Sequence, residues 1–425
     1  MKKAIITTWL IWPLLYLAAG AQTLTLEQCV SSAMANHPTS RKVPLIMQVE
    51  QVNRQLINQS SLPVVILNAQ ATWQSDVVNF TLDQPFPVTF PVIPKDQYKV
   101  TVDVQQMLYD GGVRQIRQSL NTLETTIKKD ELEVVHQKLR SSVEQIFFSI
   151  LVVEKKKATA ELMLRTLDAT IARTKAAVQH GIVKSEELEV LGAEQTRMEQ
   201  QILEIQYTRR RLLAGLSVLM GQTFSSNVKL VTPLIPTSVV DGQRPEIRLF
   251  ALQMNHLSWQ QKLLQTQRIP KLIGFGQAGY GKPGLNFLGD SWEPYTLVGV
   301  KASWNIWDWN KTRREKQLLN ITRKSISIDQ EQFEQQLAIQ IDQTRITIEK
   351  YRRLIEKGKE LVAHRQHISE VYKSRLENGM IPASLFLAEW NNQQDALNRL
   401  EQYKIQQLAA EYQLLTLQSK HESHE

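Results

Sequence analysis

The chain has 425 residues, of which 42% are hydrophobic and 22% charged, and its formal net charge is +8 at pH 7. Because basic and acidic residues are interspersed, this mild excess does not require a nucleic-acid partner. The single cysteine, Cys29, excludes an internal disulfide. It also lacks the small preceding residues of a lipoprotein box, so we expect a buried or merely tolerated thiol.

The N-terminus has the pattern of a secretory signal peptide. Lys2 and Lys3 precede an apolar stretch at 4–17, and the segment ends in Ala19-Gly20-Ala21. A basic start, a short apolar run and a small-x-small ending are typical of an export signal, so we expect residues 1–21 to be removed. The alternative is a retained N-terminal anchor. No later segment has the roughly 18 consecutive apolar residues of a membrane-spanning helix, so a membrane-embedded chain would need closed β-structure.

The chain contains an internal duplication. The segment 62–73 resembles 269–280, with Pro63 and Pro270 separated by 207 residues (270 − 63). Further along, Asp110 and Asp308 are separated by 198 residues (308 − 110). Because both offsets hold over long stretches, we expect two structural repeats, each with the order helix, β-hairpin, long helical hairpin. The predicted boundaries are 22–241 for the first repeat, 242–418 for the second and 419–425 for a polar tail.

Four segments are predicted as strands. Apolar and polar residues alternate over 67–73, over 98–105 and over 298–306, which is typical of strands with one apolar and one polar face. The segment 272–280 is rich in glycine, and its assignment rests on its match to the first repeat. Proline-rich loops at 82–94 and 281–294 separate the strands of each pair.

Two long helical hairpins follow the strands. The stretch 113–180 contains no proline or glycine, so it could form a helix on the order of 100 Å long. It ends at Gly181, and its counterpart ends at Gly379, as helices commonly do. New helices are expected near Ser185 and Ala383. Their apolar residues recur with a seven-residue period typical of coiled coils: Leu188, Leu191, Met198, Ile202, Ile205 and Leu212 in one, Leu400, Tyr403, Ala410, Leu414 and Leu417 in the other.

Four strands are too few to close a membrane barrel, since the smallest have about eight. An open sheet in lipid would leave unpaired backbone groups, so we expect the chain to share a barrel with copies of itself. Aromatic residues lie near the strand ends or faces, as interfacial aromatic residues do: Trp73, Tyr98, Tyr280, Tyr295, Trp304 and Trp307. The alternative is a soluble β-sandwich with an aromatic core. The predicted fold is therefore mainly α, with duplicated coiled-coil hairpins and four strands contributing to an oligomeric barrel.

Several motifs resemble the TolC family of outer-membrane efflux proteins. They are the segment 24–30 (LTLEQCV), Asn36-His37-Pro38, Leu108-Tyr109-Asp110-Gly111-Gly112, and the paired glycines Gly181 and Gly379. The resemblance covers essentially the whole chain after the signal. It implies a homotrimer with a twelve-stranded barrel in the outer membrane of a Gram-negative bacterium and a helical tunnel in the periplasm. It also implies a periplasmic adaptor and an inner-membrane transporter as partners, for efflux or type I secretion without chemistry or cofactor.

The resemblance also suggests functional residues. Two turns would be the periplasmic tips that contact the adaptor: Gly181, Ile182 and Val183 in the first, and Gly379, Met380 and Ile381 in the second. Glu187 matches a position that is acidic in some relatives, which makes it a candidate for the entrance gate. Leu376 and Ile381 stand where some relatives carry a tyrosine and an arginine, so any gate must use other contacts. The alternative is that these are ordinary helix turns.

The strand-to-helix junctions are Asp110-Gly111-Gly112 and Asp308, whose aspartates we interpret as helix caps and not as catalytic groups.

Other patterns that could indicate chemistry have simpler explanations. The segment 274–279 (GFGQAG) spells a dinucleotide-binding fingerprint, but no helix follows it to bind phosphate, so we expect a strand in which backbones approach closely. His364 and His367 could share a metal, yet no third ligand is evident. No catalytic constellation is found, so we expect no enzyme, metal or cofactor. Two alternatives stay open: a soluble periplasmic coiled-coil scaffold or adaptor, and a metal-efflux channel that uses these histidines.

Overall fold

The computed structural model describes residues 23–78, 93–224, 227–235, 244–286 and 288–418. The predicted signal peptide, the polar tail and most of the first strand-connecting loop lie outside these residues. The chain forms two compact units. Unit 1 contains Met1–Ser40, Val135–Gly242 and Leu337–Glu425, and unit 2 contains Arg41–Val134 and Gln243–Gln336. Each unit thus combines segments from both proposed repeats.

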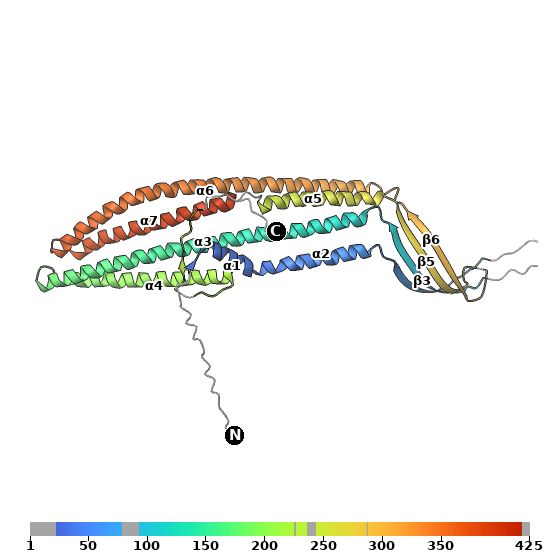
Figure 1. Ribbon diagram of the computed structural model, residues 1–425, viewed down its shortest axis with the longest axis horizontal. Helices are drawn as coiled ribbons and strands as arrows, with labels where there is room; N and C mark the ends of the chain where they lie inside the picture. Colours follow the sequence, from blue (N-terminus) through green and yellow to red (C-terminus); the bar gives the residue numbers. More distant parts are fainter. Residues whose placement is uncertain (1–22, 79–92, 225–226, 236–243, 287, 419–425) are drawn as a thin grey trace, which may run out of the picture. The chain divides into compact units, whose positions relative to one another are not determined.

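Apart from the additional helix α1 at the start, the same succession of elements occurs twice along the chain (Figure 1). The first series is α1 (Leu26–Asn36), α2 (Lys42–Gln59), β2 (Val64–Trp73), β3 (Asp96–Tyr109), α3 (Val113–Gln179) and α4 (Glu186–Met220). The second is α5 (Pro245–Gln265), β5 (Lys271–Lys282), β6 (Glu293–Ser303), α6 (Lys311–Glu377) and α7 (Ala383–Gln418). Short elements complete the description: β1 (Thr23–Leu24), β4 (Lys229–Leu230) and the 3-10 turns Pro38–Arg41 and Thr266–Arg268. The mainly helical fold with a small β part is confirmed.

The long helices begin and end where the sequence predicts. Both α3 and α6 have 67 residues. Each is followed by a glycine in the left-handed conformation, Gly181 with φ 71° and Gly379 with φ 67°. A left-handed glycine lets the last backbone N–H groups turn back onto the helix carbonyls, which ends the helix. No helix of the described ranges is apolar over a stretch long enough to cross a membrane.

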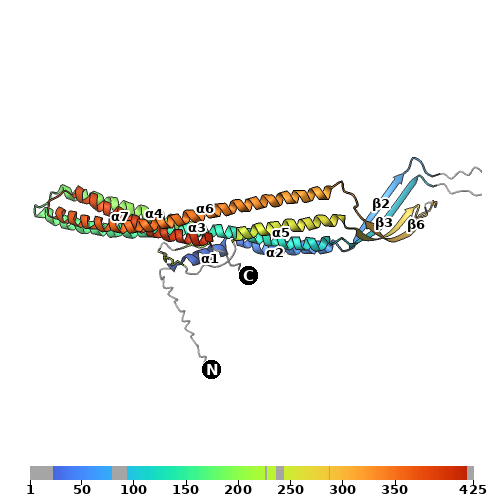
Figure 2. The same cartoon turned by 90° about the horizontal axis from the view of Figure 1, so that it is seen from above.

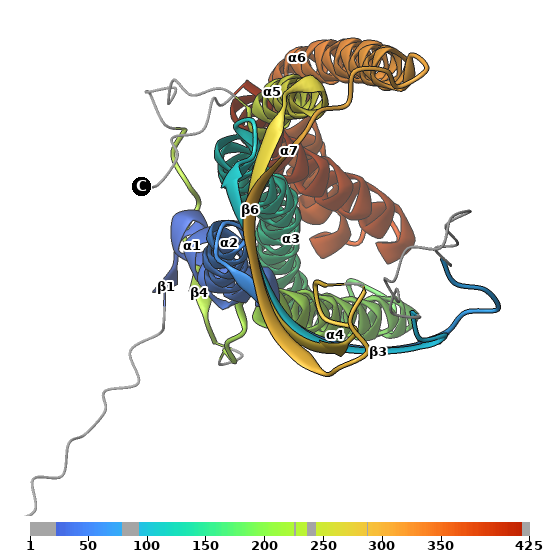
Figure 3. The same cartoon turned by 90° about the vertical axis from the view of Figure 1, so that its right-hand side faces the viewer.

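Unit 2 contains a four-stranded antiparallel sheet in the order β2-β3-β5-β6. Figure 2 shows β2 beside β3, and Figure 3 shows the curvature of the sheet. In the register, Leu67 pairs with Val102, and Val102 pairs with Ala278. Because side chains alternate between faces, this register puts the apolar residues of the predicted pattern on one face. The opposite face carries the polar residues of the same alternating pattern.

The predicted last strand is too long by three residues. The alternation suggested a strand to Ile306, but β6 ends at Ser303, which pairs with Lys271, the first residue of β5. The preceding residue of the partner, Pro270, has no backbone N–H to continue the ladder. Beyond the strand, the indole Nε1 of Trp304 donates a hydrogen bond of 2.9 Å to the carbonyl oxygen of Arg268.

The glycine-rich segment 274–279 lies within β5 and has no helix after it. Gly279 pairs with Tyr295 across the sheet, and a Cβ on Gly279 would overlap the tyrosine ring. Gly299 of β6 has the same relation to the ring of Phe275. For Gly279 the reason therefore differs from the close approach of backbones expected for this segment: an aromatic ring covers it, as one also covers Gly299.

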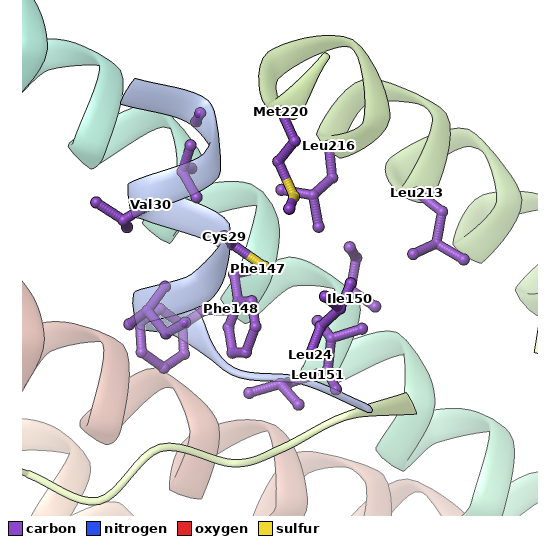
Figure 4. Packing of buried hydrophobic residues seen from close by; sticks show 14 of the residues in the cluster. Leu24, Cys29, Val30, Phe147, Phe148, Ile150, Leu151, Leu213, Leu216 and Met220 are labelled. Atoms are coloured by element: carbon purple, nitrogen blue, oxygen red, sulfur yellow. The ribbon is translucent and has the colours of Figure 1, made fainter. Parts of the chain in front are cut away.

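Unit 1 has a core around the N-terminal helix (Figure 4). Cys29 of α1 is fully buried among Phe147, Leu216 and other apolar residues of α3 and α4. Burial raises the pKa of its thiol to about 11, so the reactive thiolate is disfavoured at neutral pH. The start of α1 is fixed by a capping box between Thr25 and Gln28. Cys29 is therefore a buried apolar residue, as expected.

Helical turns and strand-to-helix junctions as the candidate functional site

The turn between α3 and α4 is closed by its own backbone. The N–H of Ile182 donates to the carbonyl of Ala177 at 2.9 Å, and the N–H of Gly181 donates to Val178 at 3.0 Å. This pair of hydrogen bonds is the Schellman arrangement, which requires a residue with positive φ. Ile182 is 55% exposed, whereas Val183 is 9% exposed. Of the predicted contact residues in this turn, Ile182 is thus the apolar side chain available to a partner.

The turn between α6 and α7 repeats this geometry. The N–H of Met380 donates to the carbonyl of Arg375 at 2.8 Å, and Gly379 donates to Leu376 at 2.9 Å. Met380 is 72% exposed, and Ile381 packs against a buried cluster of unit 1. In both turns the residue after glycine projects outward and the next residue packs inward.

The two turns lie against each other at one end of unit 1 (Figure 1). A Cβ added to Gly379 would collide with the carbonyl oxygen of Ile182. Beneath the turns, apolar residues of α3, α4, α6 and α7 form one cluster whose fully buried members include Leu191, Leu376 and Trp390. The guanidinium of Arg173 also forms an ion pair of 3.1 Å with Glu377.

Glu187, the candidate gate residue, contacts the second hairpin of its own chain. Its carboxylate Oε2 accepts a hydrogen bond of 2.6 Å from the backbone N–H of Ala383, the first residue of α7. The residue before α7 is Pro382, whose side chain offers no acceptor to cap the helix. Glu187 supplies the missing acceptor, and its negative charge is favourable at a helix N-terminus. Sequence reasoning missed this contact, although the absent cap at Pro382 was a signal for it.

At the first junction, Asp110 caps α3. Its Oδ1 accepts from the N–H of Gly112 at 2.9 Å and its Oδ2 accepts from the N–H of Arg114 at 2.7 Å. Gly111 and Gly112 have φ values of 73° and 87°, which glycine adopts at low cost. A Cβ on Gly111 would also lie 3.0 Å from the Ile269 side chain. The chain therefore turns from strand to helix where a side chain has little room.

At the second junction, Asp308 caps α6 in the same way. Its Oδ2 accepts from the N–H of Thr312 at 3.1 Å and from the Thr312 hydroxyl, and the Arg268 guanidinium lies 3.3 Å from Oδ1. These contacts, chiefly those with Thr312, lower the pKa of Asp308 to about 2. Trp309 and Asn310 stand where the first junction has two glycines.

The polar face of the sheet contains a hydrogen-bonded group that sequence reasoning missed. The carboxylate of Asp103 on β3 accepts from Asn68 of β2 at 2.6 Å, from Thr101 at 2.8 Å and from Gln277 of β5. The sequence signal for it was that polar residues occupy alternate positions in three of the strands. These hydrogen bonds connect the first β-hairpin (β2 and β3) to the second (β5 and β6).

The histidines considered for metal binding are not part of a cluster. His364 and His367 are both exposed on α6. Among the residues that the structure describes, no three potential ligands lie close enough to hold a metal ion. His421 and His424 lie outside those residues.

Comparison with known proteins finds one family model and several solved structures that are similar to this chain. The family model described as outer membrane efflux protein matches residues 29–222. VceC from Vibrio cholerae shares 14% identity over 93% of this chain and 96% of its own, with a TM-score of 0.66. CmeC from Campylobacter jejuni shares 15% identity, with coverage of 94% and 87% and a TM-score of 0.65. MtrE from Neisseria gonorrhoeae shares 13% identity, with coverage of 93% and 89% and a TM-score of 0.64.

No curated protein sequence matches the chain. At these identities the solved structures show a shared fold, and the family model adds a match in sequence across α1 to α4. Residues 29–222 thus match the outer membrane efflux protein family in sequence, and the solved channel structures extend the shared fold to more than nine-tenths of the chain.

Proposed function

We propose that this chain is one subunit of a homotrimeric outer-membrane channel that passes small molecules or polypeptides from the periplasm to the exterior. It would act with a periplasmic adaptor and an inner-membrane transporter, in efflux or type I secretion. It would carry out no chemistry of its own and bind no cofactor or metal. The observation that carries the proposal is a four-stranded sheet with an exposed apolar face and two unpaired edges.

The sheet is suited to lipid only as part of a larger ring. Its apolar face is open to the surroundings, with Leu67 72% exposed and Val298 84% exposed. Its outer strands, β2 and β6, each pair on one side within the described chain. Unpaired strand edges are not tolerated in lipid, and closure needs about eight strands or more. Three copies supply twelve, with the polar face lining the lumen.

The helices next to the sheet support the same arrangement. Exposed apolar residues on α2 are spaced four, three and four apart: Leu45, Val49, Val52 and Leu56. On α6, Leu318, Ile321 and Ile328 are also exposed at heptad spacing. Such seams pack against other helices in coiled coils. The α2 seam of one copy and the α6 seam of the next would form the wall between subunits.

The turns of unit 1 are the proposed adaptor contacts. Ile182 and Met380 project from the left-handed glycines, so they are the side chains that an adaptor would meet first. In a gating role, Glu187 would act either through its hydrogen bond to the backbone N–H of Ala383 or after that hydrogen bond has broken.

The repeat boundaries 22–241 and 242–418 are part of this proposal, since each repeat would contribute one β-hairpin and one helical hairpin.

Cross-linking of edge strands tests the assembly. A Cys29→Ser chain would carry Leu67→Cys on β2 and Val298→Cys on β6, and intact membranes would be treated with a bismaleimide. A ring that joins β2 of one copy to β6 of the next gives covalent dimers and trimers only when one chain carries both cysteines. The two single-cysteine chains are the controls and should stay monomeric.

The same membrane preparation distinguishes the proposed channel from the alternative function, a soluble periplasmic scaffold. A soluble periplasmic scaffold would be recovered outside the membrane fraction, without the trimeric product. That outcome would exclude the channel. The exposed apolar sheet face favours the membrane protein, because such large apolar patches are uncommon on soluble monomers.

A further inference from the structure

The second strand-to-helix junction contains a tryptophan in a backbone conformation that tryptophan avoids. Trp309 has φ 51° and Asn310 has φ 61°, and within the described ranges they are the two residues other than glycine with positive φ. At the first junction the corresponding positions are Gly111 and Gly112. A left-handed backbone is disfavoured for L-residues, and for a bulky side chain it is an outlier that points to a function.

Packing inside the chain does not explain this tryptophan. Trp309 is 81% exposed. Its ring contacts the ring of Trp307 edge to face, with 5.8 Å between the two ring centroids. Trp307 is itself 68% exposed and Ile306 is 76% exposed. The strained turn thus presents a group of apolar side chains to the surroundings.

Basic residues follow directly. The first turn of α6 contains no acidic residue and three basic ones, which are Lys311, Arg313 and Arg314. All three are exposed. Cations at a helix N-terminus are opposed by the helix dipole, so they do not stabilise α6. Lys311 has a distant partner in Glu315 at 3.9 Å, and no carboxylate of the described residues pairs with Arg313 or Arg314.

We propose that Ile306, Trp307 and Trp309, together with Lys311, Arg313 and Arg314, form a binding site for anionic phospholipid at the periplasmic surface of the outer membrane. The inference rests on the proposed channel function. The indoles occupy the interface between acyl chains and headgroups, where tryptophan is enriched. The cations bind the phosphate of the headgroup, as basic clusters next to a membrane do.

The position of the site selects lipid as the occupant. The group begins three residues after Ser303, where β6 ends, and the exposed apolar face of the sheet stops at the same level. A lipid-facing sheet therefore leads directly into the aromatic group, and the positive charges follow on the helix side. This order, apolar then aromatic then basic, is that of a bilayer crossed from its core to its surface.

Two variants separate the ring from the backbone strain. Trp309→Gly removes the indole and permits positive φ, and Asn310→Gly relieves the adjacent residue while it keeps the indole. In detergent without lipid, both trimers should resist heat at least as well as the wild type. In phosphatidylethanolamine nanodiscs doped with phosphatidylglycerol, the wild type and Asn310→Gly should gain thermal stability from the anionic lipid. Trp309→Gly should lose most of that gain.

A second pair of variants tests the charges. Arg313→Gln/Arg314→Gln should raise the phosphatidylglycerol fraction needed for half of the stabilisation by roughly tenfold or more. Arg323→Gln/Lys324→Gln removes the same charge about 15 Å further along α6 and should respond like the wild type. Both the measurement and its controls use the full chain as a trimer.

The inference is overturned if Trp309→Gly and Arg313→Gln/Arg314→Gln respond to phosphatidylglycerol as the wild type does. It is also overturned if the distant control loses the response equally, since the effect would then be one of net charge. A wild-type chain that does not enter nanodiscs as a trimer would instead refute the proposed channel. The two failures are therefore distinguishable.

Discussion

Glu187 and Ala383, which are 196 residues apart in the chain, are joined by a hydrogen bond of 2.6 Å between the glutamate carboxylate and the backbone N–H. The bond connects the start of α4 to the start of α7 and so links the two helical hairpins of unit 1. A helix that begins after Pro382 would otherwise have an uncapped first turn.

Replacing Glu187 tests this link. Glu187→Ala should destabilise the first turn of α7 by about 1 kcal/mol, and Glu187→Gln by less because it keeps an acceptor oxygen. Hydrogen exchange of the amides at 383–386 measures the effect. Glu189→Ala is the control, since Glu189 has the same charge in the same turn but is exposed. Equal acceleration of exchange in both variants would show that charge alone is responsible.

The two tip glycines should differ in their tolerance of a side chain. Gly181→Ala and Gly379→Ala both place a Cβ at positive φ, which costs about 1 to 2 kcal/mol. At Gly181 the Cβ meets no atom within 4 Å, whereas at Gly379 it collides with the Ile182 carbonyl oxygen. We expect Gly379→Ala to lower the thermal stability clearly more and to make the tip more sensitive to limited proteolysis. Equal losses would contradict the close packing of the turns.

A similar comparison applies to the sheet. Gly279→Ala would force the ring of Tyr295 from its place, whereas a Cβ on Gly276 has open space around it. Overpacking typically costs about 1 to 3 kcal/mol. We therefore expect Gly279→Ala to reduce the heat resistance of the assembled protein on gels, and Gly276→Ala to leave it unchanged. A stable Gly279→Ala protein would mean that the ring has another position available.

Glu144 should make stability depend on pH. Burial raises the pKa of its carboxyl above the ordinary value of a glutamate, despite the opposing effects of Arg140 and Thr416. A raised folded-state pKa stabilises the fold below the unfolded value, and this contribution is lost as pH rises through the folded pKa. The stability of the wild type relative to Glu144→Gln should therefore fall as the pH rises from the ordinary carboxyl range toward neutrality. A difference that stays constant over this range would contradict a raised pKa.

Sequence alone determined the features that depend on local backbone preferences. A stretch of 113–180 without proline or glycine predicted α3, and the glycines at 181 and 379 predicted where the long helices end, because few other residues adopt the left-handed conformation. Alternation of apolar residues predicted the strands, since strand side chains alternate between faces. The duplication and the family resemblance gave the order of elements in the same way, from patterns along the chain.

Contacts between distant segments were decided by the tertiary structure. The capping of α7 by Glu187, the covering of Gly279 by Tyr295 and the outward position of Ile182 with Val183 packed inward depend on side chains that meet only after folding. The end of β6 at Ser303 was likewise set by its neighbour, because a strand extends only as far as a partner offers hydrogen bonds. Local patterns specify the elements, and packing specifies which residues of those elements are left to bind.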